Sequence, residues 1–577
     1  MTCARKIDAA TIDALRSRLT TLYEDRADEC LSKLLQLVEQ HFRRLPADSR
    51  CGWDERDVVL ITYGDQVQSD SRTPLAELQN FLVGHRLDEL IRTVHLLPFY
   101  PFSSDDGFAV IDHREVDLAL GDWEDVRELG RKFELMFDLV VNHASSRSRW
   151  FQEYLAGNEP HVRYFIEADP QTDLSAVTRP RSLPLLTPVE TSRGTRHVWT
   201  TFSADQIDLN FANPAVLCEM LDVLLHYIRQ GARIIRLDAI AYLWKQIGTS
   251  CIHLPQTHEI VKLFRDLLGA VAPHVLLLTE TNVPHAENVS YFGHGDEAQI
   301  VYQFSLPPLL LDALLNQDAR PLVTWLAALE PARPGTTFLN FTASHDGVGV
   351  RPLEGLITED RFERLVQSVR SCGGLVSTRR QPGGTDAPYE LNISYVSALG
   401  DPRNPDIDLH VRRFLTSQGL MLSLRGIPGV YFHSLFGTPN DLESAESGGQ
   451  PRRINRRKFL REELDLQLAD TGSLQARIFA GYRHLLSTRT GQPAFHPDAR
   501  QDVWHCDEPW LIALQRTSLD GEQRILVLAN VSEEKRQVDL SRFSELSSMR
   551  DLLSNRRVDC RQRIELAPCS LVWLESL

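Results

Sequence analysis

The chain has 577 residues, a formal net charge of −16 and 42% hydrophobic residues, a composition typical of a globular protein. This length exceeds a single core and predicts two or more domains, while the negative charge argues against nucleic acid and anionic membranes as partners. The N-terminus lacks an apolar signal-peptide core, no segment reaches the length of a membrane span, and the nine cysteines include no CxxC pair. We therefore expect a cytoplasmic protein with reduced thiols.

Residues 1–55 carry apolar side chains at helical spacing, and we expect a helical extension that packs without taking part in chemistry. From residue 58 onward, short apolar runs alternate with helical patterns such as 216–228 and 260–268. The runs of strand type are 58–63, 93–99, 135–141, 233–237, 275–279, 300–304, 337–341 and 427–432. Eight strands that alternate with helices predict a closed parallel (β/α)₈ TIM barrel of the α/β class.

Two connections in this alternation are too long for ordinary loops. We expect them to form inserted domains at 144–212 and 347–402, the second of which contains a Gly-rich stretch at 381–388. The barrel itself is then divided into residues 56–143, 213–346 and 403–492. Alternating runs such as 524–529 and 570–574 replace the helical patterns near the end of the chain and predict an antiparallel β domain over 493–577.

Four polar segments follow four of the predicted strands. They contain Asp138, Asn142 and His143; Arg236 and Asp238; Glu280; and His345 and Asp346. Catalytic residues of (β/α)₈ barrels project from the C-terminal ends of the strands. Because all four segments occupy such ends, the sequence predicts that they meet in one site.

Asp238 and Glu280, which end neighbouring predicted strands, are suited to the cleavage of a glycosidic bond. A retaining glycosidase needs one carboxylate that attacks the sugar carbon and one carboxylic acid that protonates the leaving oxygen, roughly 5–5.5 Å apart. Arg236 points to the same side as Asp238 and should keep it ionised. Desolvation should raise the pKa of Glu280 toward the working pH. The alternative is that these groups are buried ion pairs at strand ends.

These segments resemble the signature regions of the α-amylase family of glycoside hydrolases and transglycosylases, over residues 56–577. Within this family the chain resembles the sucrose phosphorylase group at 60–64, 106–113, 236–242, 248–251, 306–311 and 453–456. The resemblance implies that Asp238 is the nucleophile, Glu280 the acid/base and Asp346 the stabiliser of the transition state. The further residues that it implies for binding of a terminal glucose are Asp105, Phe108, His143, Gln206, Arg236, Tyr242, His345 and Arg456.

Phosphorolysis requires a group that places phosphate where water would otherwise attack, and the planar fork of arginine suits phosphate. The first long connection offers Arg179 and Arg181 on either side of Pro180. By resemblance Arg181 matches the phosphate-contacting arginine of sucrose phosphorylases; the alternative is a solvated surface charge. The expected small molecules are an α-glucoside, inorganic phosphate and α-glucose 1-phosphate. No cofactor is expected, and no metal either, because Asn142 lacks carboxylate-rich neighbours at suitable spacing.

The acceptor side departs from the sucrose phosphorylases, whose Asp-Leu-Tyr-Gln segment is replaced here by residues 387–390, which end in Tyr389 and Glu390. Loss of that acidic residue and the nearby Arg379 and Arg380 favour an anionic acceptor, although Glu390 is an unfavourable neighbour for one. Thr281 and Asn282, where those enzymes have Val-His, and the N-terminal extension resemble the glucosylglycerate phosphorylases of the group.

We therefore expect the chain to convert glucosylglycerate and phosphate into α-glucose 1-phosphate and D-glycerate. Three alternatives stay open: phosphorolysis of sucrose or sucrose 6′-phosphate, hydrolysis or transglucosylation, and a non-catalytic binding role. Retention of Asp238, Glu280 and Asp346 argues against the last. Whether the protein is a monomer or a homodimer is also left open by the sequence.

Overall fold

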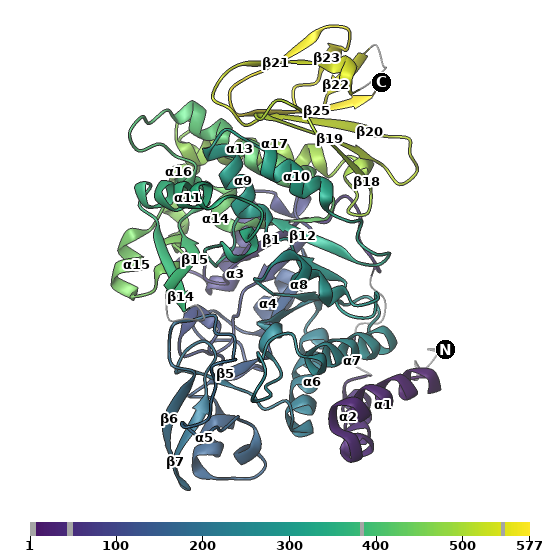
Figure 1. Ribbon diagram of the computed structural model, residues 1–577, viewed down its shortest axis with the longest axis vertical. Coiled ribbons are helices and arrows are strands. Elements are labelled where there is room, and N and C mark those ends of the chain that lie inside the picture. The colour runs from purple at the N-terminus through teal and green to yellow at the C-terminus, as the bar shows by residue number, and fades with distance from the viewer. Residues whose placement is uncertain (1–6, 43–44, 46–49, 381–385, 544–547, 577) are drawn as a thin grey trace.

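A computed structural model describes residues 7–42, 45, 50–380, 386–543 and 548–576, and eight parallel strands in it close into a barrel (Figure 1). The strands are β1 (Val59–Thr62), β3 (Thr93–Leu96), β4 (Glu134–Val140), β9 (Ala232–Asp238), β10 (Leu276–Thr279), β11 (Ile300–Tyr302), β12 (Thr337–Phe341) and β16 (Ile427–Tyr431). They follow one another around the barrel in sequence order. Each lies within or overlaps one of the eight predicted runs, so the barrel is confirmed.

Helices cover the outside of the barrel, which explains why its strands are apolar on both faces. The main ones are α3 (Pro74–Gly84), α4 (Trp123–Gly130), α6 (Pro214–Arg229), α7 (Pro255–Val271), α9 (Leu306–Leu315), α10 (Arg320–Ala328), α13 (Ile407–Ser423) and α17 (Leu474–Arg489). Their starts follow local rules: Asn213 caps α6 ahead of Pro214, and Asp122 forms a capping box with Asp125 at α4.

The register of three neighbouring strands sets the height of the polar groups at the mouth of the barrel. Asp138 on β4 is level with Arg236 on β9, and Leu237 is level with Thr279 on β10. Glu280, the residue after β10, donates its backbone N–H to the carbonyl of Leu237 at 3.2 Å. Glu280 and Asp238 therefore leave their strands side by side at the C-terminal end.

The two long connections add secondary structure above this mouth. The first contains β5 (His143–Ser145) paired with β8 (Gln206–Asp208), helix α5 (Arg149–Ala156) and a hairpin of β6 (Leu186–Thr191) and β7 (Gly194–Trp199). The second contains helix α11 (Glu359–Ser371) and a sheet of β13 (Val348–Gly349), β15 (Asp386–Asn392) and β14 (Leu375–Arg380). Residues 381–385 of the Gly-rich stretch lie outside the described residues. The boundaries of the inserted domains stay predictions.

The end of the chain forms the predicted antiparallel sheet, drawn in yellow in Figure 1. Its strand order is β18 (Arg500–Trp504), β19 (Leu511–Thr517), β20 (Arg524–Asn530), β25 (Ser570–Ser576), β22 (Ser548–Asp551) and β23 (Arg556–Asp559). A two-stranded sheet of β21 (Arg536–Asp539) and β24 (Arg563–Leu566) accompanies it. Helix α13 lies against this sheet, since Trp573 Nε1 on β25 donates to the hydroxyl of Ser423 at 2.9 Å.

At the other end of the chain, α1 (Ala9–Tyr23) and α2 (Ala27–Phe42) lie against the barrel helices α7 and α6 (Figure 1). Leu15 and Leu19 are buried at this contact, and Arg18 pairs with Glu259 and Asp266 on α7. No residue of α1 or α2 that the structure describes lines the catalytic cavity defined below. This arrangement fits the expectation of an extension that packs.

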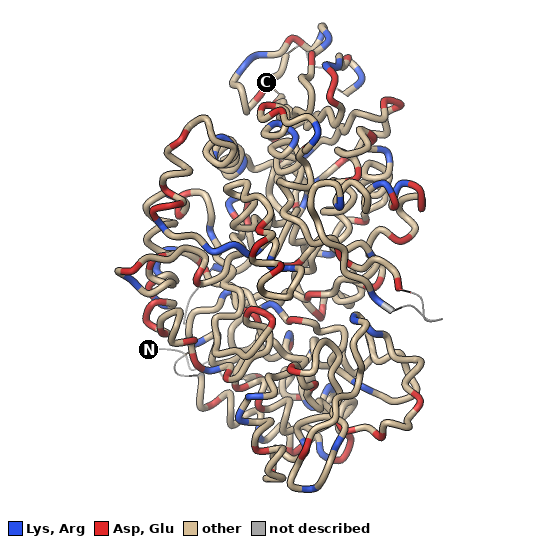
Figure 2. The backbone as a smooth tube through the Cα atoms, turned by 90° about the vertical axis from the view of Figure 1, so that its left-hand side faces the viewer, with Lys and Arg blue, Asp and Glu red and all other residues tan. Residues whose placement is uncertain are grey.

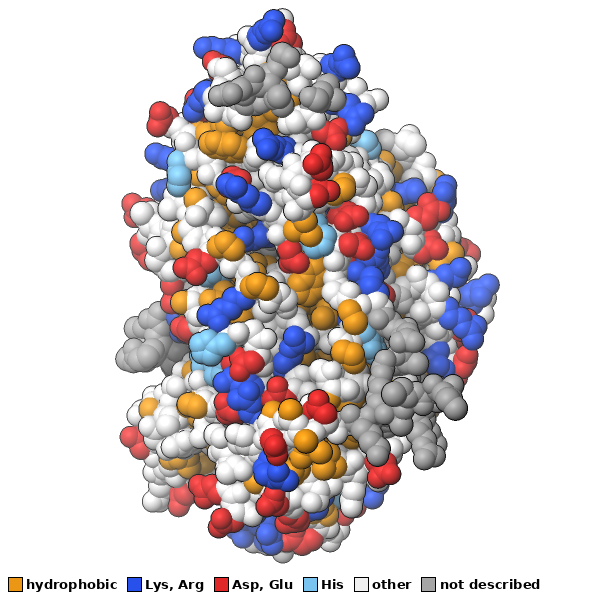
Figure 3. Space-filling model, turned by 90° about the vertical axis from the view of Figure 1, so that its right-hand side faces the viewer, with side chains coloured by type: hydrophobic (Ala, Val, Ile, Leu, Met, Phe, Trp, Pro, Cys, Tyr) orange, Lys and Arg blue, Asp and Glu red, His pale blue; other side chains and the backbone are white. Residues whose placement is uncertain are grey.

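The surface and the thiols agree with the composition. Figure 2 shows acidic and basic residues interspersed along the backbone, and Figure 3 shows apolar side chains scattered between charged ones on one face. Within the described ranges, no helix is long and apolar enough to cross a membrane. Cys218 and Cys251 are buried and are not joined in a disulfide.

Candidate active site

A cavity of about 70 Å³ lies at the C-terminal mouth of the barrel. It is lined by Asp105, Phe108, His143, Arg181, Phe202, Gln206, Arg236, Asp238, Ala239, Ala241, Tyr242, Glu280, Thr281, Asn282, Val283, His345, Asp346, Tyr389 and Arg452. Of the residues predicted from the sequence to act in catalysis or to bind substrate or phosphate, all line this cavity except Arg179, Glu390 and Arg456; Asp138, Asn142 and Arg379 also lie outside its lining. Four strand ends and both long connections contribute to one enclosure.

Arg236 is the centre of the charged groups at the floor of the cavity. Its Nη1 lies 2.7 Å from Asp238 Oδ1 and also pairs with Asp138, while its Nη2 lies 4.0 Å from Glu280 Oε2. His95 Nε2 contacts the other oxygen of Asp138 at 2.7 Å. Burial alone would lower the pKa of Arg236, but Asp138 and Asp238 raise it well above its usual value. A permanently charged guanidinium therefore holds both candidate catalytic carboxyls.

The pKa values of these two carboxyls are set mainly by burial. Removal from water raises the pKa of Asp238 to about 6, although Arg236 acts in the opposite direction. The same balance raises the pKa of Glu280 to about 7. The sequence predicts that Arg236 keeps Asp238 ionised; a pKa of about 6 leaves the carboxyl ionised at neutral pH, but it lies above the usual value because burial outweighs Arg236 and Asp138 adds to the rise. Glu280 carries the higher pKa of the two, as an acid/base requires.

A strained turn and a stacked pair of rings form one wall. Asp105 and Asp106 both have a left-handed backbone, with φ of 53° and 46°, a conformation that costs energy in non-glycine residues. The next residue, Gly107, has φ of 114°, and a Cβ on it would lie 2.6 Å from the carbonyl of Pro98. The turn delivers Phe108, whose ring stacks on His345 with centroids 4.9 Å apart. A flat apolar wall of this kind suits the face of a sugar ring.

The polar groups beside this wall are mostly neutral donors. His143 Nε2 donates to the carbonyl of Phe108 at 3.0 Å, and Gln206 Nε2 donates to Asp105 Oδ2 at 3.3 Å. Burial lowers the pKa of His143 and lowers that of His345 well below its usual range. Uncharged imidazoles and an amide can exchange hydrogen bonds with sugar hydroxyls without adding charge. Tyr242 lines the cavity as predicted and packs edge-on against Phe202, with centroids 5.4 Å apart.

Asp346 faces Arg452, a residue that was not predicted for the site. Arg452 Nη1 lies 2.5 Å from Asp346 Oδ1, as an ion pair without the alignment of a hydrogen bond. Burial works against it, but Arg452, His345 and Arg456 lower the pKa of Asp346. Asp346 is thus a fixed negative charge. The sequence does contain Arg452 directly before the 453–456 stretch that resembles the sucrose phosphorylase group, and this position was the available signal.

Glu390 and Arg456, two of the predicted contacts, lie behind the cavity wall. Glu390 is buried and accepts from Nε and Nη2 of Arg452 at 3.0 and 2.8 Å and from the backbone N–H of Gly347 at 3.2 Å. Arg456 donates to the carbonyl of His345 at 2.8 Å and pairs with Asp106. Both residues therefore act on the cavity through other residues. Glu390 lies behind the wall because its carboxylate is paired with the Arg452 guanidinium, which neutralises its charge.

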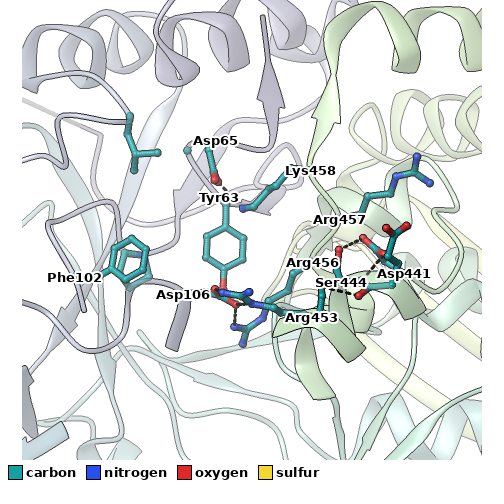
Figure 4. A pocket seen from close by; sticks show the side chains of 15 residues that line it. Tyr63, Asp65, Phe102, Asp106, Asp441, Ser444, Arg453, Arg456, Arg457 and Lys458 are labelled. Carbon is teal, nitrogen blue, oxygen red and sulfur yellow. Dashed lines mark hydrogen bonds and ion pairs between the residues drawn. The ribbon is translucent and has the colours of Figure 1, made fainter. Parts of the chain in front are cut away.

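Arg456 also lines a second cavity of about 650 Å³, shown in Figure 4. Its side chain and that of Arg453 converge on Asp106, and Lys458 lies between Asp65 and the ring of Tyr63. Arg456 Nη2 is 3.9 Å from Asp346 Oδ1, so this arginine stands between the two cavities. Figure 4 shows that the cationic side chains of this second cavity come from residues 453–458.

The two arginines of the first long connection take different positions. Arg181 lines the cavity and lies over the ring of Tyr389, with 5.7 Å between its Cζ and the ring centroid. Arg179 donates to the carbonyl of Leu183 and does not line the cavity. Arg379, expected near the acceptor, pairs with Glu354 at 2.9 Å and does not line it either. Nothing is described for the side chain of Arg380. The candidate anion site therefore rests on Arg181.

Asn142 does not present its oxygen to an open metal site. Its Oδ1 accepts from Lys245 Nζ at 2.7 Å, and the same ammonium pairs with Asp208 at 2.5 Å. Across the described ranges, no group of three or more His, Cys, Asp or Glu side chains is arranged to hold a metal ion. A lysine ammonium group therefore provides the positive charge beside Asn142.

Comparison with known proteins gives consistent relatives. Residues 87–329 match the family model of the α-amylase catalytic domain. The chain is 48% identical over 528 residues to the glucosylglycerate phosphorylase of Allomeiothermus silvanus, covering 91% of this chain and 93% of that protein. It is 44% identical to the glucosylglycerate phosphorylase of Spirochaeta thermophila, covering 98% of each. In fold it matches the crystal structure of sucrose 6F-phosphate phosphorylase from Thermoanaerobacter thermosaccharolyticum, with a TM-score of 0.72 and 24% identity over 89% of this chain and 98% of that one.

The buried carboxyl pair predicts a narrow pH optimum for the cleavage of an α-glucosyl donor. With Asp238 as the nucleophile and Glu280 as the acid, as predicted from the sequence, the reaction needs the first ionised and the second protonated, so the rate should rise as pH increases through about 6 and fall above about 7. The measurement is kcat/KM against pH for a donor whose leaving group needs protonation. Glu280→Gln cannot titrate and should lose the alkaline limb with an activated donor; an alkaline limb that is unchanged in Glu280→Gln would assign that limb to another group.

Proposed function

This chain belongs to the α-amylase family, and we propose that it acts there as a retaining α-glucoside phosphorylase that converts glucosylglycerate and phosphate into α-glucose 1-phosphate and D-glycerate. The observation that carries the proposal is the pair Asp238 and Glu280, which face one cavity on either side of Arg236. The identity to curated glucosylglycerate phosphorylases over more than nine-tenths of the chain supports the choice of substrate.

In the first half-reaction, the Asp238 carboxylate attacks the anomeric carbon of the glucosyl group from the side opposite the leaving oxygen. The glycosidic C–O bond breaks, and Glu280 gives its proton to the departing D-glycerate hydroxyl. The product is a β-linked glucosyl ester of Asp238 and an ionised Glu280. The high pKa of Glu280 supports the role of donor, because the proton is present at neutral pH.

In the second half-reaction, phosphate replaces D-glycerate as the partner of the anomeric carbon. A phosphate oxygen attacks, the ester bond to Asp238 breaks, and the proton of the attacking phosphate returns to Glu280. Two inversions at carbon give an α-linked product. Arg181, which lines the cavity, is the guanidinium available to hold the phosphate during attack.

The remaining groups bind the glucosyl unit. Asp346 would stabilise the positive sugar carbon and accept hydrogen bonds from glucose hydroxyls, as its lowered pKa permits. Phe108 offers a flat apolar face, and His143 and His345 offer neutral donors and acceptors. Arg456, which pairs with Asp106 and lies 3.9 Å from Asp346, stands between this cavity and the second one and would limit the site to a terminal glucosyl unit.

The covalent step makes the stereochemistry of the product predictable. The first sugar phosphate formed should be α-glucose 1-phosphate, which proton NMR distinguishes from the β anomer. Asp238→Asn should reduce glucosyl transfer to background while leaving the folded protein intact, because the side chain keeps its shape and loses its charge. β-Glucose 1-phosphate as the initial product would contradict the double displacement.

If Arg181 holds the phosphate, Arg181→Ala should lose phosphorolysis activity much more than hydrolysis activity. Loss of one charge-assisted contact is worth about 1.5–3 kcal/mol, so phosphorolysis should fall about tenfold or more through the KM for phosphate. Hydrolysis of the same donor should fall much less, because water needs no cation. Arg179→Ala, whose side chain lies outside the cavity, is the matched control. Equal losses of phosphorolysis and hydrolysis in Arg181→Ala would assign Arg181 a structural part only.

The acceptor is tested in the synthetic direction. The enzyme is incubated with α-glucose 1-phosphate and D-glycerate, fructose, fructose 6-phosphate, glycerol or water, and the release of phosphate is measured. D-Glycerate should give the highest kcat/KM, and added salt should weaken its use more than that of the neutral acceptors. A preference for fructose would identify a sucrose phosphorylase, a preference for fructose 6-phosphate a sucrose 6′-phosphate phosphorylase, and water alone a hydrolase.

A further inference from the structure

Three arginines line the cavity, and they differ in how many of their guanidinium N–H groups already donate hydrogen bonds to carboxylates. They are Arg181, Arg236 and Arg452. Arg236 is committed to Asp138 and Asp238 at the floor. Arg452 is held on one edge only: its Nε and Nη2 both donate to Glu390, while Nη1 makes no aligned hydrogen bond with any described residue. Nη1 of Arg452 therefore faces the cavity without an aligned hydrogen bond, although it is in an ion pair with Asp346.

Glu390 makes this orientation rigid. It is 1% exposed, it takes two parallel hydrogen bonds from the arginine fork, and it is itself fixed by the backbone N–H of Gly347. Two-point pairing of this kind fixes the plane of a guanidinium as well as its position. Its neighbour on β15, Tyr389, carries Arg181 over its ring. The dipeptide Tyr389-Glu390 thus supports the two cavity arginines that are not bound to the floor.

A glucosyl unit needs more room than the cavity offers, so some of the side chains that line it must move when the unit binds. The cavity holds about 70 Å³, far below the roughly 300–1,000 Å³ of ordinary small-molecule sites. Asp346 Oδ1 is buried and has no aligned hydrogen-bond donor among the described residues, so sugar hydroxyls can supply one. As they do, Arg452 Nη1 loses part of its partner while Glu390 keeps the other edge in place.

We propose that Arg452, oriented by Glu390, binds the carboxylate of the acceptor through Nη1. The inference rests on the proposed function and names the group that selects an acid over a neutral polyol. An acceptor carboxylate in this cavity approaches Asp346 and Glu280, which are both acidic, and it needs a guanidinium N–H that faces the cavity and is not already used in an aligned hydrogen bond. Arg452 meets that need. Glu390, an unfavourable neighbour when considered alone, is a positioning residue that acts through Arg452 and does not touch the acceptor.

The test compares two acceptors of nearly the same shape, the anion D-glycerate and the neutral D-glyceramide, with α-glucose 1-phosphate as donor. In the wild type, D-glycerate should have the higher kcat/KM. Arg452→Lys keeps the charge but loses the fork, and Glu390→Gln keeps the shape but loses the charge that orients the fork. Each should reduce the ratio of glycerate to glyceramide by about tenfold or more, mainly through the KM for glycerate. Arg379→Lys, in which an arginine outside the cavity is changed in the same way, is the matched control.

Each outcome is decisive. The proposal is overturned if the ratio is unchanged in both Arg452→Lys and Glu390→Gln, while both variants still release phosphate from α-glucose 1-phosphate with water as the acceptor. Equal losses for glycerate and glyceramide also overturn it, because they show that Arg452 acts through Asp346 or the fold alone. A reduced ratio of glycerate to glyceramide in Arg379→Lys would show that Arg379, and not Arg452, binds the acceptor carboxylate. Failure of the proposed function is seen separately: the wild type itself would then fail to prefer glycerate, before any variant is compared.

Discussion

The buried guanidinium of Arg236 is the interaction on which the rest of the site depends. Three carboxyl groups, on Asp138, Asp238 and Glu280, lie around it; the first two are buried and Glu280 is partly buried. Carboxylates this close would repel one another strongly in a medium of low polarity. Arg236 makes their approach possible, and the parallel register of β4, β9 and β10 places it at the right height. Fold and chemistry thus share one constraint: the strands must align for the charges to balance.

The same arrangement gives the carboxyl groups of Asp238 and Glu280 different surroundings. Asp238 lies 2.7 Å from Arg236, whereas Glu280 lies 4.0 Å away and accepts a backbone hydrogen bond from Ala239 at 3.1 Å. Burial raises both pKa values, and the closer cation keeps that of Asp238 below that of Glu280. This order of the two pKa values supports the proposal that Asp238 is the nucleophile, which must be charged, and Glu280 the acid, which must hold a proton.

How far the sequence predicted the site follows from how each residue is positioned. Asp238 ends β9, Glu280 directly follows β10 and His345 comes shortly after β12, and parallel strands bring such positions to one edge of the barrel. The contacts of Glu390 and Arg452 lie 62 residues apart in sequence and depend on how two long segments fold against each other. No periodicity in the sequence reports that pairing. For this reason Glu390 was predicted as an acceptor contact, while Arg452 and Phe202 were missed.

This difference also explains how one barrel can serve several acceptors. In the proposed reaction, the nucleophile Asp238 and the acid Glu280 lie at the ends of β9 and β10, where a change in backbone position would disturb the Arg236 charge balance. Arg181 and Tyr389 belong to the long connections, and Arg452 lies in η8 (Pro451–Asn455), beyond the last barrel strand. Their packing can change without moving β9 or β10. The residues that act on the glucosyl donor and the residues near the acceptor are therefore positioned by different parts of the chain. A change in the charge of residue 390 can alter acceptor binding through Arg452 without moving the strand-end residues.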